Sequence, residues 1–156
     1  MKKIDISAVK AVLGSGYPPP YDEPCRQRQR RRLGDAARLT QFGVNLLRLP
    51  PGVWSSQRHW HTAEDEFVYI LEGEVVLVSD AGEEVLRAGD CAGFKAAEPD
   101  GHQLQNRSNA EVVLLEIGSR NPEKDGVDYP DIDLEIRAGD RGFLHKDGTP
   151  YPPRAR

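Results

Sequence analysis

The sequence is poor in cysteine, in aromatic residues and in long hydrophobic runs. Its two cysteines, Cys25 and Cys91, are far apart and form no Cys-x-x-Cys pair, so we expect both to be reduced. No apolar run approaches the roughly 20 residues that a membrane-spanning helix needs. The first residues lack the sustained apolar core of a signal peptide, and we therefore expect a cytoplasmic protein with no membrane partner.

The sequence also has no excess of positive charge. Lys and Arg total 21 and Asp and Glu total 25, which gives a formal net charge of −4. One basic run, Arg26–Arg32, contains no interleaved aromatic residue. We interpret it as a solvated arm that balances acidic residues elsewhere or pairs with a second subunit. Nucleic acid is not an expected partner.

Helical periodicity is absent between residues 39 and 117, where short apolar segments alternate with turn residues such as Gly73 and Gly82. The predicted strands cover residues 40–49, 57–61, 66–71, 74–79, 83–88, 91–94, 102–106 and 111–117. Short strands at this regular spacing are typical of an all-β sandwich or barrel.

The segments that flank this region are less regular. Within residues 1–38, three consecutive prolines exclude helix at residues 14–20, whereas residues 4–13 are either a short helix or a strand. Residues 119–156 contain one further strand candidate at 132–136. We predict an N-terminal arm at 1–38, a barrel at 39–118 and a C-terminal extension at 119–156. The extension is expected to pack on the barrel or on a partner subunit.

Two predicted strands, 67–71 and 112–117, are apolar on both faces. A strand with one face in water would alternate apolar and polar residues, so both faces are expected to be covered. The inner face fills the barrel, and the outer face requires the arm, the tail or another subunit. We predict a homodimer for this reason.

The most informative stretch contains two histidines two residues apart, His59 and His61. In a strand these side chains lie on one face, about 6.5 Å apart. Glu66 follows after a short turn and begins the next strand, and His102 opens a later one. Three imidazoles and one carboxylate suit a divalent first-row transition metal (Fe, Mn, Ni or Zn), with two octahedral positions open for a small-molecule ligand or substrate.

Neighbouring polar and aromatic residues have less defined roles. Strand alternation places Trp60 and Tyr69 away from the metal face. Glu64 and Asp65 are either a base at the entrance or a solvated turn. His145 lies among turn residues and is interpreted as a surface histidine. Candidate anion contacts, which the sequence does not rank, are Arg48, Gln57, Lys95 and Gln105.

The spacing of these residues resembles the two sequence motifs of cupins. In the first, Gly52 precedes His59-Trp60-His61, four residues lead to Glu66, and six more reach Gly73. In the second, Gly89-Asp90 begins the motif and Gly101-His102 followed by Asn106 ends it, whereas the Pro-x-Gly element is replaced by residues 95–100. The chain is most similar to small bacterial single-domain cupins of type 2.

This resemblance implies an all-β fold, the double-stranded β-helix or jelly-roll barrel, here with an irregular N-terminal arm and C-terminal tail. It also implies a dimer, with His59, His61, Glu66 and His102 as metal ligands. The family includes dioxygenases, decarboxylases, isomerases, storage proteins and sensors, so the fold does not select one activity.

Two functions follow as hypotheses. The first is a metalloenzyme that acts on a small oxygenated substrate, a sugar derivative or a hydroxy or keto acid, by Lewis-acid isomerase or lyase chemistry or by dioxygenase chemistry. The second is a non-catalytic module that binds or senses a small ligand through the same metal site.

Overall fold

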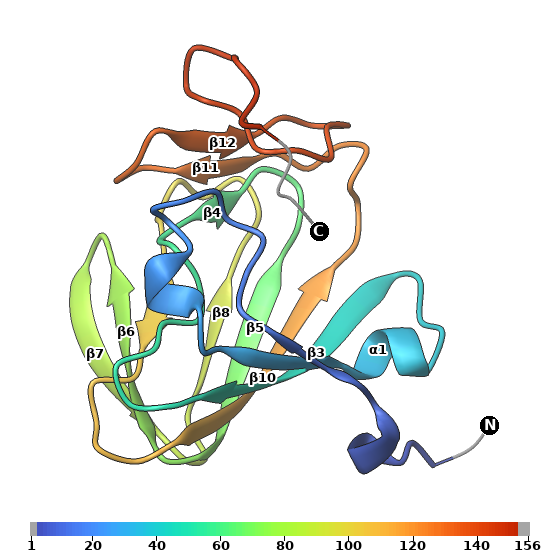
Figure 1. The fold of residues 1–156 in the computed structure, drawn as a ribbon, viewed down its shortest axis with the longest axis vertical. Coiled ribbons are helices and arrows are strands. Elements are labelled where there is room, and N and C mark those ends of the chain that lie inside the picture. Colours follow the sequence, from blue (N-terminus) through green and yellow to red (C-terminus); the bar gives the residue numbers. More distant parts are fainter. Residues whose placement is uncertain (1–2, 153–156) are drawn as a thin grey trace.

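The computed structural model describes residues 3–152, and its elements are almost entirely β-strands (Figure 1). The strands are β1 (Ala11–Leu13), β2 (Gln29–Arg32), β3 (Phe42–Leu49), β4 (Trp60–His61), β5 (Glu66–Glu72), β6 (Glu74–Ser79), β7 (Gly82–Arg87), β8 (Cys91–Phe94), β9 (Gln103–Gln105), β10 (Val112–Ser119), β11 (Val127–Tyr129) and β12 (Leu134–Ile136). One short α-helix, α1 (Leu33–Ala36), and two 3-10 turns, Ile6–Ala8 and Glu23–Cys25, complete the described part. The all-β prediction is confirmed. Within the described residues, no helix is long and apolar enough to cross a membrane.

Three antiparallel sheets build the barrel. A six-stranded sheet has the order β1-β2-β3-β10-β5-β8, and a three-stranded sheet has the order β7-β6-β9. A third sheet, β12-β11-β4, lies across one end of the barrel, at the top of Figure 1. This end sheet joins the C-terminal segment to the histidine-bearing strand, because Val127 pairs with His61 and Asp128 with Trp60.

Strand β5 shows how the sequence pattern becomes a wall of the barrel. Val68 is 6% exposed and Ile70 is fully buried, since they point inward at a spacing of two residues. Phe67, Tyr69 and Leu71 point outward and remain 40%, 39% and 41% exposed. Within residues 3–152, therefore, neither the arm nor the tail fully covers the outer face of β5.

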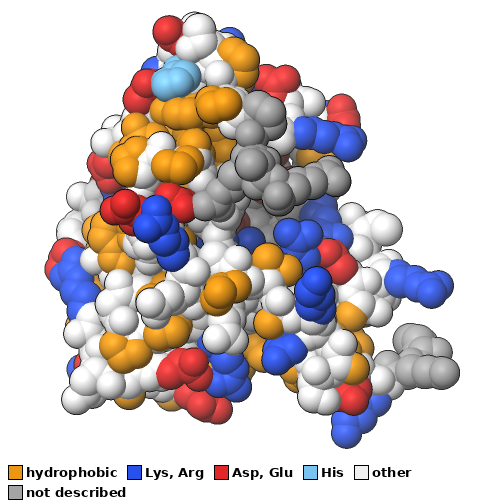
Figure 2. Space-filling model, in the orientation of Figure 1, with side chains coloured by type: hydrophobic (Ala, Val, Ile, Leu, Met, Phe, Trp, Pro, Cys, Tyr) orange, Lys and Arg blue, Asp and Glu red, His pale blue; other side chains and the backbone are white. Residues whose placement is uncertain are grey.

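The interior is divided into two apolar clusters. The barrel cluster contains Leu47, Leu49, Val53, Val68, Ile70, Val75, Leu86, Leu104, Val112 and Leu114. The second cluster joins the N-terminal arm to the end sheet and contains Tyr17, Cys25, Val127, Tyr129 and Leu134. In the space-filling view, hydrophobic side chains gather over β11 and β12 at this end (Figure 2). The chain segments on either side of the barrel thus pack on each other as well as on the barrel.

The N-terminal segment differs from the sequence prediction, because β1 and β2 extend the main sheet. Gln29–Arg32 pairs with β3, so the basic run is not simply a solvated arm. Arg28 is only 6% exposed and donates hydrogen bonds to the carbonyl oxygens of Gly14 and Ser55. The guanidinium groups find acceptors inside the molecule, which allows a strongly basic strand to enter the fold.

Candidate metal centre

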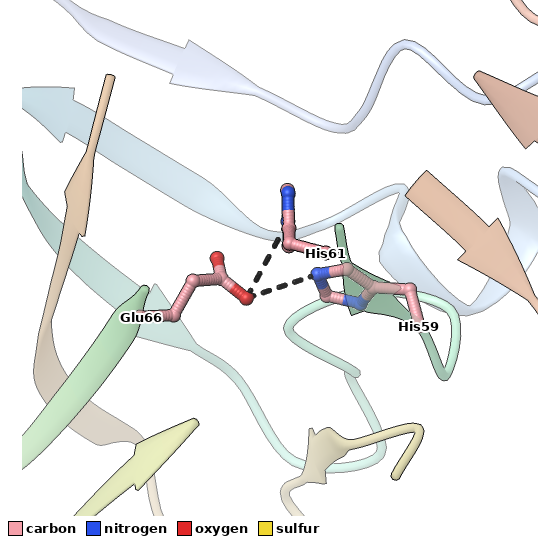
Figure 3. Close-up of side chains that lie close together, drawn as sticks. All are labelled: His59, His61 and Glu66. Atoms are coloured by element: carbon pink, nitrogen blue, oxygen red, sulfur yellow. Dashed lines mark ion pairs between the residues drawn. The ribbon is translucent and has the colours of Figure 1, made fainter. Parts of the chain in front are cut away.

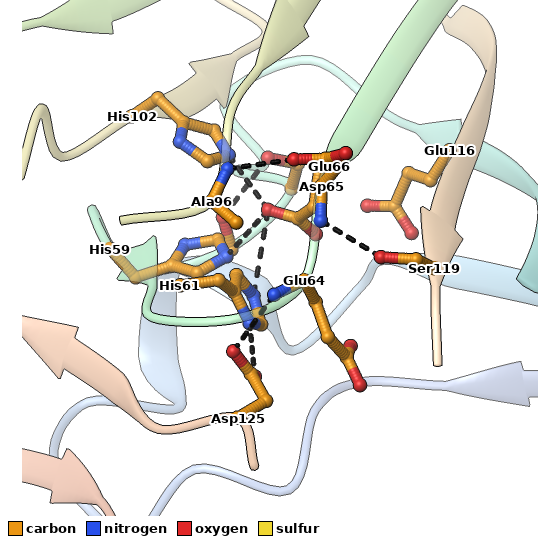
Figure 4. Close-up of polar contacts among 12 residues, drawn as sticks. His59, His61, Glu64, Asp65, Glu66, Ala96, His102, Glu116, Ser119 and Asp125 are labelled. Atoms are coloured by element: carbon orange, nitrogen blue, oxygen red, sulfur yellow. Dashed lines mark hydrogen bonds and ion pairs between the residues drawn. The ribbon is translucent and has the colours of Figure 1, made fainter. Parts of the chain in front are cut away.

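The four residues that the sequence singled out converge inside the barrel. The Oε2 atom of Glu66 lies 3.3 Å from Nε2 of His59, 3.5 Å from Nε2 of His61 and 3.0 Å from Nε2 of His102 (Figures 3 and 4). His61 is in β4 and Glu66 begins β5. His59 and His102 face each other across a bridge whose two backbone hydrogen bonds measure 3.1 and 2.9 Å. The chain therefore has a His/Glu group that could hold a divalent metal.

The hydrogen bonds made by Nδ1 of two histidines determine the protonation of the Nε2 atoms that face Glu66. Nδ1 of His59 lies 2.9 Å from the carbonyl oxygen of Gln57, which only accepts, so Nδ1 carries the proton. Nδ1 of His61 lies 2.6 Å from the Asp125 carboxylate and is assigned in the same way. In the neutral rings, both Nε2 lone pairs then face the Glu66 carboxylate. A bound cation would resolve this opposition of acceptors, and the donor set fits a first-row metal.

The charges of the group shift the pKa values of its members. Burial raises the pKa of Glu66. When the surrounding imidazoles carry an additional proton on Nε2, the charge of His59, the hydrogen bond from His102 and the charge of His61 outweigh burial and hold the pKa of Glu66 well below its usual range. Burial lowers the pKa of His61, whereas the hydrogen bond to Asp125 and the charge of Glu66 raise it above the usual value. Burial lowers the pKa of His102. Glu66 is therefore ionised at neutral pH and available as an anionic ligand.

Asp125 is a site residue that the sequence analysis did not identify. Besides the bond to His61, its Oδ1 accepts from the backbone N–H groups of Ala63 and Glu64 at 2.8 and 3.1 Å (Figure 4). It thereby fixes both the ring of His61 and the turn that leads to Glu66. The only sequence signal is a carboxylate before Gly126 in the segment ahead of β11, which is too weak to reveal a contact across more than 60 residues.

Aromatic rings hold the other two histidines. The ring of Phe94 stacks on His102 with 3.5 Å between centroids and an interplanar angle of 2°. Tyr129, from β11, stacks on His59 at 5.7 Å and meets Tyr17 edge to face. Burial raises the pKa of Tyr129 well above its usual value, so this phenol stays neutral. Packing from two strands, β8 and β11, thus restricts the imidazole orientations.

A cavity of about 360 Å³ opens beside the group and is lined by His59, His61, Glu66 and His102 together with Glu64. Burial raises the pKa of Glu64, and one of its carboxylate oxygens accepts from the backbone N–H of Asn121. None of the candidate anion contacts named from the sequence lines this cavity; these were Arg48, Gln57, Lys95 and Gln105. Its basic lining residues are Arg28, Arg30 and Arg120 instead.

The remaining residues named from the sequence lie outside this cavity. Tyr69 is on the outer face of β5, and Trp60 donates to Asp128 at 3.3 Å. His145 binds Asp133 at 2.6 Å in the C-terminal segment. The carboxylate of Asp65 accepts from the backbone of Ala96, which is a structural contact.

Comparisons with known proteins agree on one family. The sequence model of the family described as the cupin domain matches residues 45–118 of this chain. A solved structure from Silicibacter pomeroyi, called a sugar phosphate isomerase from a cupin superfamily, is 43% identical and superposes with a TM-score of 0.89. The match covers 97% of each of the two chains. No curated protein matches this chain.

Two further structures extend the comparison. A protein from Acidithiobacillus ferrooxidans, for which the activity of a sugar phosphate isomerase has been suggested, is 31% identical over 78% of each chain with a TM-score of 0.70. The polyketide cyclase of Streptomyces resistomycificus is 22% identical over 76% of this chain and 79% of that chain, with a TM-score of 0.60. At 22% identity, the similarity to the polyketide cyclase concerns the fold alone.

Proposed function

This chain belongs to the cupin superfamily, and on that premise we propose that it is a metal-dependent enzyme acting on a small oxygenated substrate. The observation that carries the proposal is the convergence of three imidazole nitrogens on one carboxylate oxygen, at 3.0–3.5 Å, beside a cavity of about 360 Å³. Small-molecule sites have this combination of a concave volume and a few directed polar groups.

In this proposal, His59, His61, Glu66 and His102 hold a divalent ion of the Fe, Mn, Ni or Zn type. When bound, such an ion supplies Lewis-acid polarisation of substrate oxygens. Asp125 and the carbonyl of Gln57 keep the Nδ1 protons of two ligands, so that the Nε2 lone pairs stay directed at the cavity.

Glu64 is the carboxylate that we assign as the proton acceptor. It lines the cavity, and one of its oxygens lies within 4.8 Å of both a ring nitrogen of His61 and a carboxylate oxygen of Asp125. Burial raises its pKa, which favours a group that takes up a proton from substrate and returns it. Phe94 and Tyr129 cover the ligand rings and exclude water from that side.

Isomerisation of a sugar derivative is the chemistry that the comparisons favour. Two of the similar structures, at 43% and 31% identity, bear names that refer to a sugar phosphate isomerase. Isomerisation moves a proton between adjacent carbons, which requires a base and an electrophile that polarises the carbonyl oxygen. The cavity offers the carboxylate of Glu64 beside the candidate metal centre.

Elemental analysis of protein purified without chelators tests the metal assignment. We expect about one first-row ion per chain in the wild type and a loss of most of it in His59→Ala and His102→Ala. A wild-type protein without first-row metal, which also fails to take one up on dialysis, would contradict the metal site.

A screen of aldose and ketose phosphates, keto acids and hydroxy acids tests the activity. On the substrate found, Glu64→Gln should lower kcat by about 10²–10⁴ with unchanged metal content, because it removes the proton acceptor. The exposed Glu84→Gln on β7 is the matched control and should retain activity. Saturable binding across the panel with no turnover would instead support a non-catalytic binding or sensing module.

A further inference from the structure

The inner face of the six-stranded sheet changes from apolar to charged along the barrel axis. Leu47, Leu114 and Ile70 lie opposite one another on neighbouring strands and are fully buried. Two residues further along β3 and β10, at the next inward-facing level, Asn45 lies opposite Glu116. Glu116 belongs to the wall of the same cavity as the metal-binding group, and Figure 4 shows it reaching inward from β10.

Glycines leave space at the level of the metal-binding group. Gly43 pairs with Gly118, and Gly118 pairs with Glu66. The strands therefore present no side chain at two of these three positions, and the cavity extends from Glu66 along the sheet. A Cβ on Gly118 would lie 3.3 Å from the carbonyl oxygen of Asp65, so larger residues would be tight there.

Strand β2 brings arginines to this same face. Arg30 pairs with Leu47, and residues directly opposite each other in an antiparallel pair point to the same side. Arg30 is therefore directed inward, as is Arg28 two residues earlier. Both line the cavity that also contacts His59 and Glu66. Arg31, between them, pairs with Leu46 and points to the opposite face.

The guanidinium groups of Arg28 and Arg30 have few partners that carry negative charge. The guanidinium of Arg28 has only the carbonyl oxygens of Gly14 and Ser55 as partners and takes part in no ion pair among residues 3–152. Arg30 pairs with Glu116 at 3.0 Å through one terminal nitrogen, whereas its buried Nε has no acceptor in the described protein. Among residues 3–152, Glu116 is thus the one carboxylate that forms an ion pair with either of these two guanidinium groups. A buried charge without a counter-ion is strongly destabilising.

We propose that Arg30, supported by Arg28, binds an oxyanion of the substrate, a carboxylate or a phosphate, at the part of the cavity wall formed by β2, in the same cavity as the candidate metal centre. Guanidinium is suited to this task because its planar donors match the oxygens of either anion. The reactive part of the same molecule then lies at His59, His61, Glu66 and His102. The placement of the reactive part at these four residues depends on the proposed function, whereas the oxyanion site does not.

Titration calorimetry with matched probe pairs tests the proposal. Ribose 5-phosphate is compared with ribose, and lactate with lactamide, in both metal-free and metal-loaded protein. We expect at least one charged probe to bind tenfold or more tightly than its neutral counterpart, and to do so without metal. The pair that shows the preference identifies the anion. Equal binding within both pairs would overturn the oxyanion site, even if the protein binds metal.

Three variants separate anion binding from a structural ion pair. Arg30→Gln should lose the charged-over-neutral preference while keeping its metal content, and Arg31→Gln, the same change on the opposite face, should keep the preference. Glu116→Gln should strengthen binding of the charged probe severalfold, because it frees Arg30. Equal losses in both arginine variants, or a folded Glu116→Gln protein without the preference, would show that Arg30 serves only the fold. Thermal melting establishes that each variant is folded.

Discussion

Asp125 links the candidate metal centre to a segment outside the residues that match the cupin domain. We predict that Asp125→Asn weakens metal binding by about tenfold or more, since a carboxylate behind a ligating histidine orients the ring and increases its basicity. Competition with a chromophoric chelator measures the affinity.

Asp133 provides the matched control, because it binds Nδ1 of His145 at the same 2.6 Å but away from the cavity. Asp133→Asn should leave metal affinity unchanged. Equal affinities for the wild type and Asp125→Asn would mean that the surrounding rings alone orient His61.

The buried thiol of Cys25 is expected to make the stability of the protein depend on pH above 9. Burial raises the pKa of its thiol from 9.0 to about 11, while the unfolded chain ionises near 9. The unfolded state therefore loses a proton first, and stability falls as pH rises from 9 to 11, by about 2–3 kcal/mol from this group. Urea unfolding should show a shallower decline over this range in Cys25→Ala than in the wild type. Parallel declines in the two proteins would contradict the assignment.

At the scale of elements, the turn between β5 and β6 depends on Gly73. Its φ of +81° favours glycine, and a Cβ would lie 2.9 Å from the carbonyl oxygen of Glu111, a backbone atom that cannot easily move. We predict that Gly73→Ala lowers the free energy of unfolding by about 2–4 kcal/mol, from the backbone conformation and the overlap together.

Gly52 separates these two contributions. It has the same positive φ, 80°, but a Cβ there would meet nothing within 4 Å. Gly52→Ala should therefore cost only about 1–2 kcal/mol. Urea denaturation of both variants provides the measurement, and equal losses would show that the overlap at Gly73 is relieved by a small shift.

At the scale of the whole molecule, the outer face of β5 is an exposed apolar surface. Phe67, Tyr69 and Leu71 lie in one row and are each about 40% exposed, on a sheet that also carries exposed Leu13 at its edge. We propose that two copies pair through this face, because such a contiguous apolar row on a sheet is typical of an interaction surface.

Sedimentation velocity at micromolar concentration tests this assembly. The wild type should sediment as a dimer and Tyr69→Glu as a monomer, since a carboxylate in the interface would be desolvated without a partner. Val85→Glu is the control, because Val85 is equally exposed, at 42%, but lies on β7 in another sheet. A monomeric wild type would contradict the proposal.

The features that depend on local sequence pattern, such as strand positions and side-chain direction, were predicted well from the sequence. Strand alternation and turn glycines located β5, β6 and β8 within one or two residues of their observed bounds. A two-residue spacing placed His59 and His61 together. The same reasoning failed for the basic run, because a strand of arginines has no apolar alternation to mark it, although it pairs with β3 along its length.

Sequence by itself determined the all-β class and placed His59 and His61 on one strand face, because side-chain direction in a strand repeats every two residues and needs no knowledge of distant contacts. Glu66 and His102 were added by the turn after the histidines and by the resemblance to the cupin motifs. Tertiary structure alone decided what surrounds them. Asp125 behind His61 and Arg30 opposite Leu47 come from segments on either side of the barrel. Their positions follow from sheet pairing and from the need of buried charges for partners, and both depend on contacts between residues far apart in the chain.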